Sequence, residues 1–199
     1  MTPRGYPVLE DESFFIRYLE LAKKFSCQIL KMGGDPEKTR KCAEIAQKYA
    51  IKIGRNNHIG TEDKPGITET IDRTINYLSK INHPNFGILY DPSHLFVSGS
   101  DYGPETICKI KDKIFYVLVQ YLAETNKENA EFKFHNRYFK EGIIGEPNGP
   151  EFKKVFSALK QINYRGYIGV IPSRPLDKDP KEVAKIYYEK IKQILAEGE

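Results

Sequence analysis

An aspartate and a histidine follow a short apolar run near the middle of the chain. Residues 86–90 have the composition of a buried strand, and Asp91-Pro-Ser-His94 comes directly after them. Because Asp91 and His94 lie three residues apart at a strand end, we expect both side chains to face one pocket. A carboxylate oxygen and an imidazole nitrogen suit a divalent cation or the hydroxyl groups of a sugar. The pattern therefore predicts a small-ligand site at this strand end.

Strand-like and helix-like segments alternate along the chain. Short apolar runs predict strands at residues 27–32, 51–55, 86–90, 114–119 and 164–170. Apolar residues spaced by three and four predict helices at residues 14–24, 68–81, 151–161 and 179–195, and one that begins after Asp35-Pro36. About five strands that alternate with helices predict an α/β fold with a parallel sheet and crossover helices.

Two segments have less regular patterns. Ile107, Ile110, Ile114 and Val117 fit one helical face, yet residues 114–119 are rich in β-branched and aromatic side chains. We favour a short helix followed by a buried strand. Residues 126–141 are predicted to form a long polar and aromatic excursion that holds His135, and residues 145–149 a turn.

Composition indicates a soluble protein with one domain over residues 1–199. The 31 basic and 27 acidic residues are spread evenly, which argues against a nucleic-acid-binding stripe. No apolar run of about 18 residues and no apolar leader occur, so we expect no membrane partner and a cytoplasmic location. Cys27, Cys42 and Cys108 lie far apart and are odd in number, so we interpret them as buried thiols rather than disulfides or a metal site.

Four motifs, taken together, resemble those of a known family. In chain order they are Asn56-Asn57-His58-x-Gly60-Thr61, Asp91-Pro-Ser-His94-Leu, Gly145-Glu146, and Ala158-Leu-Lys-Gln-Ile-Asn-Tyr164-x-Gly-Tyr167-Ile. Their order and spacing resemble the sugar phosphate isomerase/epimerase family, which has a xylose isomerase-like TIM barrel. The resemblance extends from about Phe14 to the C-terminus. It implies an incomplete barrel that lacks the first three strands. This leaves three alternatives: a homodimer or a partner chain covers the gap, or the chain is the product of a decayed gene.

The resemblance also implies a divalent cation, manganese, magnesium or zinc. Family members hold it with a Glu, an Asp, a His and a second Glu, and the two glutamates shuttle the proton. The matching positions here are Asn56, Asp91, Leu118 and Ile171, so one full-strength donor remains. We therefore expect a weak cation site or none, and little or no family-type catalysis, because Asn56 and Ile171 occupy the acid/base positions.

Other residues complete the predicted site. The family's substrate-contacting histidine matches His94, and we add His58 and Arg174 as substrate contacts near neighbouring strand ends. In an alternative register, residues 131–137 form the barrel strand, and His135 joins Asp91 and Asn56 as a metal ligand.

Two classes of function follow from these residues. The first is a sugar or sugar-phosphate isomerase or epimerase with a degenerate metal site. The second is a non-catalytic module that binds a sugar-like ligand or a protein partner. A third interpretation is a relative of the apurinic endonucleases, but four histidines in the whole chain do not supply the metal cluster that those enzymes need.

Overall fold

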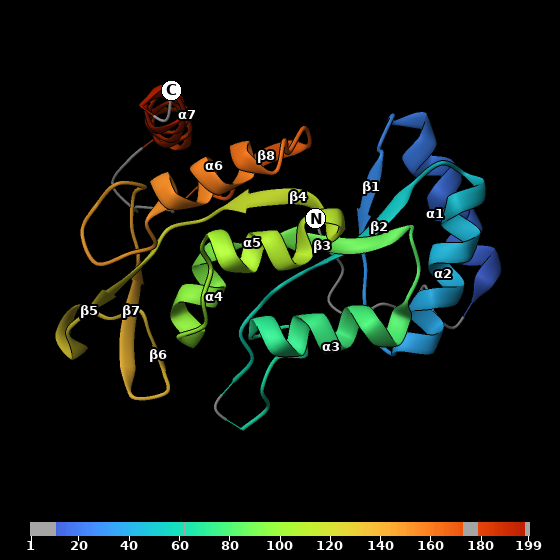
Figure 1. The fold of residues 1–199 in the computed structure, drawn as a ribbon, viewed down its shortest axis with the longest axis horizontal. Coiled ribbons are helices and arrows are strands. Elements are labelled where there is room, and N and C mark those ends of the chain that lie inside the picture. The colour runs from blue at the N-terminus through green and yellow to red at the C-terminus, as the bar shows by residue number, and fades with distance from the viewer. Residues whose placement is uncertain (1–10, 62, 173–178, 198–199) are drawn as a thin grey trace.

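A curled parallel sheet forms the centre of the molecule (Figure 1). The computed structural model describes residues 11–61, 63–172 and 179–197. The strand order is β1-β2-β3-β4-β8, and all four pairings are parallel. The strands are β1 (Ile29–Lys31), β2 (Lys52–Asn56), β3 (Phe86–Tyr90), β4 (Ile114–Val119) and β8 (Tyr167–Val170). The prediction of an incomplete barrel with five parallel strands is confirmed.

The described residues form seven α-helices, most of which lie along the outer side of the curled sheet (Figure 1). They are α1 (Glu12–Lys24), α2 (Pro36–Lys48), α3 (Ile71–Ile81), α4 (Pro92–Ser98), α5 (Pro104–Ile110), α6 (Phe152–Gln161) and α7 (Pro180–Ala196). The side chains of Asp11, Asp35, Thr70 and Asp179 accept hydrogen bonds from first-turn N–H groups, which fixes where four of these helices begin. Within the described ranges, every helix is too short or too polar to cross a membrane.

The two faces of the sheet carry different side chains. Ile53, Ile88 and Val117 are fully buried among residues of the hydrophobic clusters on the outer, helix-covered side. The strand register places Gly54, Leu89 and Tyr116 on the opposite, concave side. A groove of about 380 Å³ runs along this concave side and is lined by Ser26, Cys27, Gln28, Ile29, Lys31, Leu89, Tyr116, Leu118 and Tyr167.

A second sheet follows β4 and was not predicted. It is antiparallel, in the order β5-β7-β6, and comprises β5 (Leu122–Thr125), β6 (Phe132–Phe134) and β7 (Arg137–Glu141). His135 and Asn136 form the two-residue hairpin turn with φ of 46° and 62°, as the twist of such hairpins requires. The predicted excursion over residues 126–141 therefore contains a β-hairpin outside the barrel sheet, and the alternative register that made residues 131–137 a barrel strand is wrong.

The second sheet is held against the end of the barrel by an apolar cluster. Leu122, Phe134 and Phe139 pack with Val97 of α4, and Ile59 of the loop after β2 packs against the same group. This packing places the hairpin beside the loops that follow β2 and β3. The alternation Phe132-Lys-Phe134 was the available sequence signal for β6.

The cysteines differ from the prediction. Cys42 is buried, and burial raises the pKa of its thiol to about 11. Cys27 and Cys108 are exposed, so the interpretation of all three as buried thiols is wrong for these two. Cys27 precedes β1 and Cys108 lies on the exposed side of α5, positions that the apolar pattern did not distinguish.

Candidate functional site

Asp91 lies at the carboxyl end of β3 and is also the N-cap of α4. Its side chain is fully buried, and its Oδ1 accepts a hydrogen bond of 3.1 Å from the backbone N–H of Ser93. Its Oδ2 has no hydrogen-bond partner in the described part of the chain. Burial raises the pKa of this carboxyl to about 7, although hydrogen bonds from the Ser93 and His94 backbone lower it in part.

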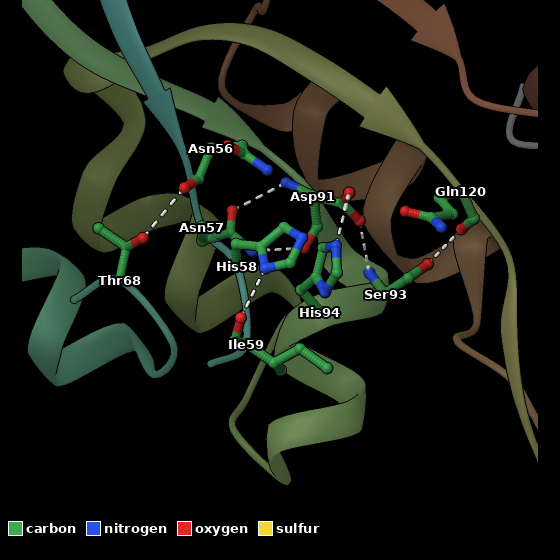
Figure 2. A network of polar contacts seen from close by, with 9 residues as sticks. All are labelled: Asn56, Asn57, His58, Ile59, Thr68, Asp91, Ser93, His94 and Gln120. Carbon is green, nitrogen blue, oxygen red and sulfur yellow. Dashed lines mark hydrogen bonds and ion pairs between the residues drawn. The ribbon is translucent and has the colours of Figure 1, made fainter. Parts of the chain in front are cut away.

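His94 lies on the first turn of α4 and faces Asp91 (Figure 2). Its Nε2 is 3.8 Å from Asp91 Oδ2, beyond hydrogen-bond length, and its buried Nδ1 has no partner among the described residues. The His58 ring lies against it, with centroids 3.9 Å apart. Burial, and to a smaller extent His58 and Lys31, lower the pKa of His94 to about 3, so the imidazole is neutral at pH 7.

Asn57 joins the ends of β2 and β3. Its Nδ2 donates to the Asp91 carbonyl at 2.5 Å, and its Oδ1 accepts from the Asp91 N–H at 2.8 Å (Figure 2). The side chain is only 1% exposed. This amide pairing extends the sheet by one step where β3 ends, so it fixes the position from which the Asp91 side chain projects.

We expect Asn57→Ala to lower the free energy of unfolding by about 2–4 kcal/mol. The substitution leaves the N–H and the C=O of Asp91 buried without partners, and each such group costs about 1–3 kcal/mol. Urea unfolding of the variant measures the loss. Asn76→Ala on the exposed face of α3 is the control and should stay within about 0.5 kcal/mol. Equal stabilities for the two variants would contradict a positioning role for Asn57.

The four positions carried over from the family lie on the concave side of neighbouring strands. Leu89 pairs with Tyr116, so Asp91 and Leu118, each two residues further on, lie at the same level of β3 and β4. Asn56 ends β2 and is buried, with its carbonyl bonded to the Thr68 hydroxyl at 3.0 Å. Ile171 follows β8 and is 40% exposed.

Gln120 is a site neighbour that sequence reasoning missed. Its side chain points toward Asp91 (Figure 2), and its carbonyl accepts a hydrogen bond from the Ser93 hydroxyl. Gln120 follows β4 directly, and its side chain projects from the same side of the chain as the side chain of Leu118. The signal was a glutamine at the end of an otherwise apolar run.

His135 reaches the same end of the barrel from the second sheet. Its Nε2 is 3.9 Å from Oε1 of Glu69, which is 5% exposed. The other oxygen of Glu69 accepts hydrogen bonds from the N–H groups of Gly60 and Gly66 at 2.9 and 2.8 Å, so this carboxylate organises the loop after β2. Arg174, the third predicted substrate contact, lies outside the described residues.

The donor set does not fit a tight metal centre. In the described ranges, no group of three or more His, Cys, Asp or Glu side chains converges on one point. Asp91 and His94 are close to each other, whereas His135 faces Glu69. A site for zinc or a transition metal needs about three or four protein ligands. The residues present therefore form a buried polar pair, in which Asp91 Oδ2 and His94 Nδ1 lack hydrogen-bond partners among the described residues, rather than a preformed metal cage.

Comparison with known proteins places this geometry in a family. The profile of the family described as xylose isomerase-like TIM barrel matches residues 13–193. The inosose dehydratase of Lactiplantibacillus plantarum is 31% identical over 160 residues, which cover 78% of this chain and 51% of that protein. The chain therefore spans about half the length of this curated relative.

Solved structures share the fold. A xylose isomerase domain protein from Alicyclobacillus acidocaldarius superposes with a TM-score of 0.71 at 16% identity, over 98% of this chain and 74% of that chain. The IolI protein, crystallised with a zinc atom, superposes with a TM-score of 0.67 at 16% identity, over 94% of this chain and 69% of that chain. D-psicose 3-epimerase from Clostridium cellulolyticum, solved with D-tagatose, superposes with a TM-score of 0.67 at 12% identity, over 98% of this chain and 73% of that chain. With the profile match over most of its length, the chain belongs to the xylose isomerase-like TIM barrel family.

Proposed function

We propose that this protein binds a sugar-like polyhydroxylated compound at the carboxyl ends of β2 and β3. It is isomerase- or epimerase-like in this proposal, with a degenerate metal site and little family-type proton transfer. Asp91 and His94 are the principal contacts, His58 and Asn56 flank them, and Arg174 is a further contact. The family supports the ligand class, since relatives include a protein named for inosose and an epimerase solved with D-tagatose.

One observation carries the proposal. Asp91 Oδ2 and His94 Nδ1 are buried, 3.8 Å separates the carboxyl from the imidazole, and neither atom has a hydrogen-bond partner among the described residues. Buried polar atoms without partners are uncommon because each costs free energy. Ligand hydroxyl groups that donate to the carboxyl and the imidazole would satisfy both atoms.

The residues limit the chemistry that accompanies binding. Isomerisation by the family route needs a carboxylate base at two positions, and here these are Asn56 and Ile171, neither of which takes up a proton at neutral pH. This observation favours the second candidate, a non-catalytic module that binds a sugar-like ligand or a protein partner through the same face. A divalent cation would add at most a weak contact at Asp91.

Calorimetry on metal-stripped protein tests the proposal. We expect measurable binding of a ketose or an inosose, and a loss of about tenfold or more in Asp91→Ala, because a buried charged or polar contact is worth about 1.5–3 kcal/mol. Titration with Mn²⁺ and Zn²⁺ is expected to give dissociation constants weaker than micromolar. Asp63→Ala, on the loop after β2, serves as a matched carboxylate control. Sugar binding that is unchanged by Asp91→Ala would contradict the proposed site.

We also infer that a second copy of the chain covers the open edges of the sheet. In the described part of the molecule, β1 and β8 each pair with one strand only. Tyr167 on β8 is 58% exposed. Light scattering during size exclusion should therefore give twice the mass of the chain, and the mass of one chain would contradict this inference.

A further inference from the structure

Lys31 is the last residue of β1, and it brings an ammonium group to the concave side of the sheet. It pairs in register with Gly54, and Gly54 pairs with Gly87, so the two strands beside Lys31 carry no side chain at this level. Lys31 lines the groove together with Leu89, Tyr116 and Leu118. The Leu89 side chain lies over Gly54 and the Phe115 ring lies over Gly87, so the wall of the groove beside the lysine is apolar.

The ammonium group of Lys31 has Asp91 as an acidic neighbour, at longer range than an ion pair. No hydrogen bond or ion pair joins its ammonium to any residue in the described ranges, although the side chain is exposed to the groove. Burial against the apolar walls and the nearby Arg55 guanidinium lower the pKa of Lys31, whereas Asp91 raises it. Lys31 in turn lowers the pKa of Asp91 and of His94. The ammonium therefore lies within electrostatic reach of both site residues.

Lys31 can supply the positive charge that a bound metal ion would otherwise bring to this site. The convergent carboxylates and histidines that a divalent cation needs are not found among the described residues. Lys31 nevertheless brings a positive charge to the groove, whose wall includes Leu118 at the level of Asp91. An ammonium group binds carboxylate and phosphate oxygens as a point charge, without a fixed coordination geometry. Its charge is also worth more against apolar walls than in open water.

We propose that Lys31 supplies the positive charge of this site and binds a negatively charged group of the ligand, so that binding needs no metal ion. This inference rests on the proposed function and names its ligand more narrowly: a sugar-like compound that carries a carboxylate or a phosphate. Asp91 and His94 contact the hydroxyl groups of the ligand, and Lys31 contacts its anionic end lower in the groove.

Calorimetry in EDTA with three probes tests the inference. The probes are D-fructose, D-gluconate and D-fructose 6-phosphate, which carry no charge, a carboxylate and a phosphate. Each is titrated into the unsubstituted protein and into Lys31→Met, Lys31→Arg and Lys52→Met. Lys52 is the control, because it pairs in register with Ile29 at the other end of the same face and lies over the Phe115 ring at 4.6 Å. Thermal melts establish that each variant is folded.

We expect at least one anionic probe to bind about tenfold or more tightly than D-fructose. Lys31→Met should lose this preference, Lys31→Arg should retain most of it, and Lys52→Met should match the unsubstituted protein. Whichever anionic probe binds more tightly identifies carboxylate or phosphate as the group that Lys31 holds.

The outcomes separate the two proposals. Binding of D-fructose that equals binding of both anionic probes, or an anion preference that survives Lys31→Met, overturns the role of Lys31 and leaves the sugar-like site in place. Failure of all three probes to bind the folded, unsubstituted protein overturns the proposed function and this inference with it.

Discussion

A variant that carries Asn56→Glu, Leu118→His and Ile171→Glu together is expected to bind Mn²⁺ or Zn²⁺ about a thousandfold more tightly than the unsubstituted protein. The substitutions place two carboxylates and an imidazole beside Asp91, which completes the ligand set that the family resemblance implies. A site with four strong donors binds such ions far better than a site with one. Calorimetry on metal-stripped protein measures the difference.

The geometry supports this expectation. Leu118 lies level with Asp91 on the adjacent strand, Asn56 ends β2, and Ile171 follows β8 with its N–H bonded to the Val119 carbonyl at 2.9 Å. Side chains from four neighbouring strand ends can therefore reach one point. Adding Asp91→Ala to the triple variant should abolish the gain. A folded triple variant whose cation affinity is unchanged would mean that the positions were carried over incorrectly.

Asp91→Asn is expected to stabilise the protein at pH 8 by about 2–4 kcal/mol. The Asp91 carboxyl is fully buried and its pKa rises from 3.8 to about 7, so ionising it in the folded state costs about 1.4 kcal/mol for each unit of that rise. Asparagine is neutral at every pH, and its Oδ1 can still accept from the Ser93 N–H. Urea unfolding at pH 8 measures the gain.

The sign of the pH dependence follows from the two pKa shifts. Below pH 3.8 Asp91 is protonated in both states. As the pH rises to about 7, the folded state holds one proton more than the unfolded state, so stability from this group falls. His94 has the opposite effect, because its pKa is about 3 in the folded state and 6.5 in the unfolded state. Its contribution to stability is therefore complete above pH 6.5 and is lost as the pH falls toward 3.

These opposite slopes give a discriminating test. Between about pH 4 and pH 6.5 the two groups offset each other in the unsubstituted protein, which predicts a nearly flat stability curve. Asp91→Asn removes one slope and exposes the other, so the stability of this variant should fall with decreasing pH below 6.5. The advantage of the variant should shrink from pH 8 toward pH 4. A constant difference over this range would mean that Asp91 does not titrate near 7.

The amino-acid sequence by itself determined the alternation of helices and strands. Hydrophobic period and capping residues act over a few residues, so the apolar runs at residues 51–55 and 86–90 and the caps Asp35 and Asp179 place their elements without tertiary contacts. Local sequence also explains the positions of Asp91 and His94. A strand end followed by a proline in the first helical turn puts both residues on one side of α4.

Tertiary structure alone decided the second sheet and the electrostatics of the site. Phe134 and Phe139 form strands because Val97 and Ile59, distant in sequence, give them a surface to pack on. Asn57 finds the Asp91 backbone only because β2 and β3 are neighbours. The pKa of Asp91 and the place of Lys31 depend on burial and on charges from three different strands. Such quantities arise from packing between segments, and no local pattern encodes them.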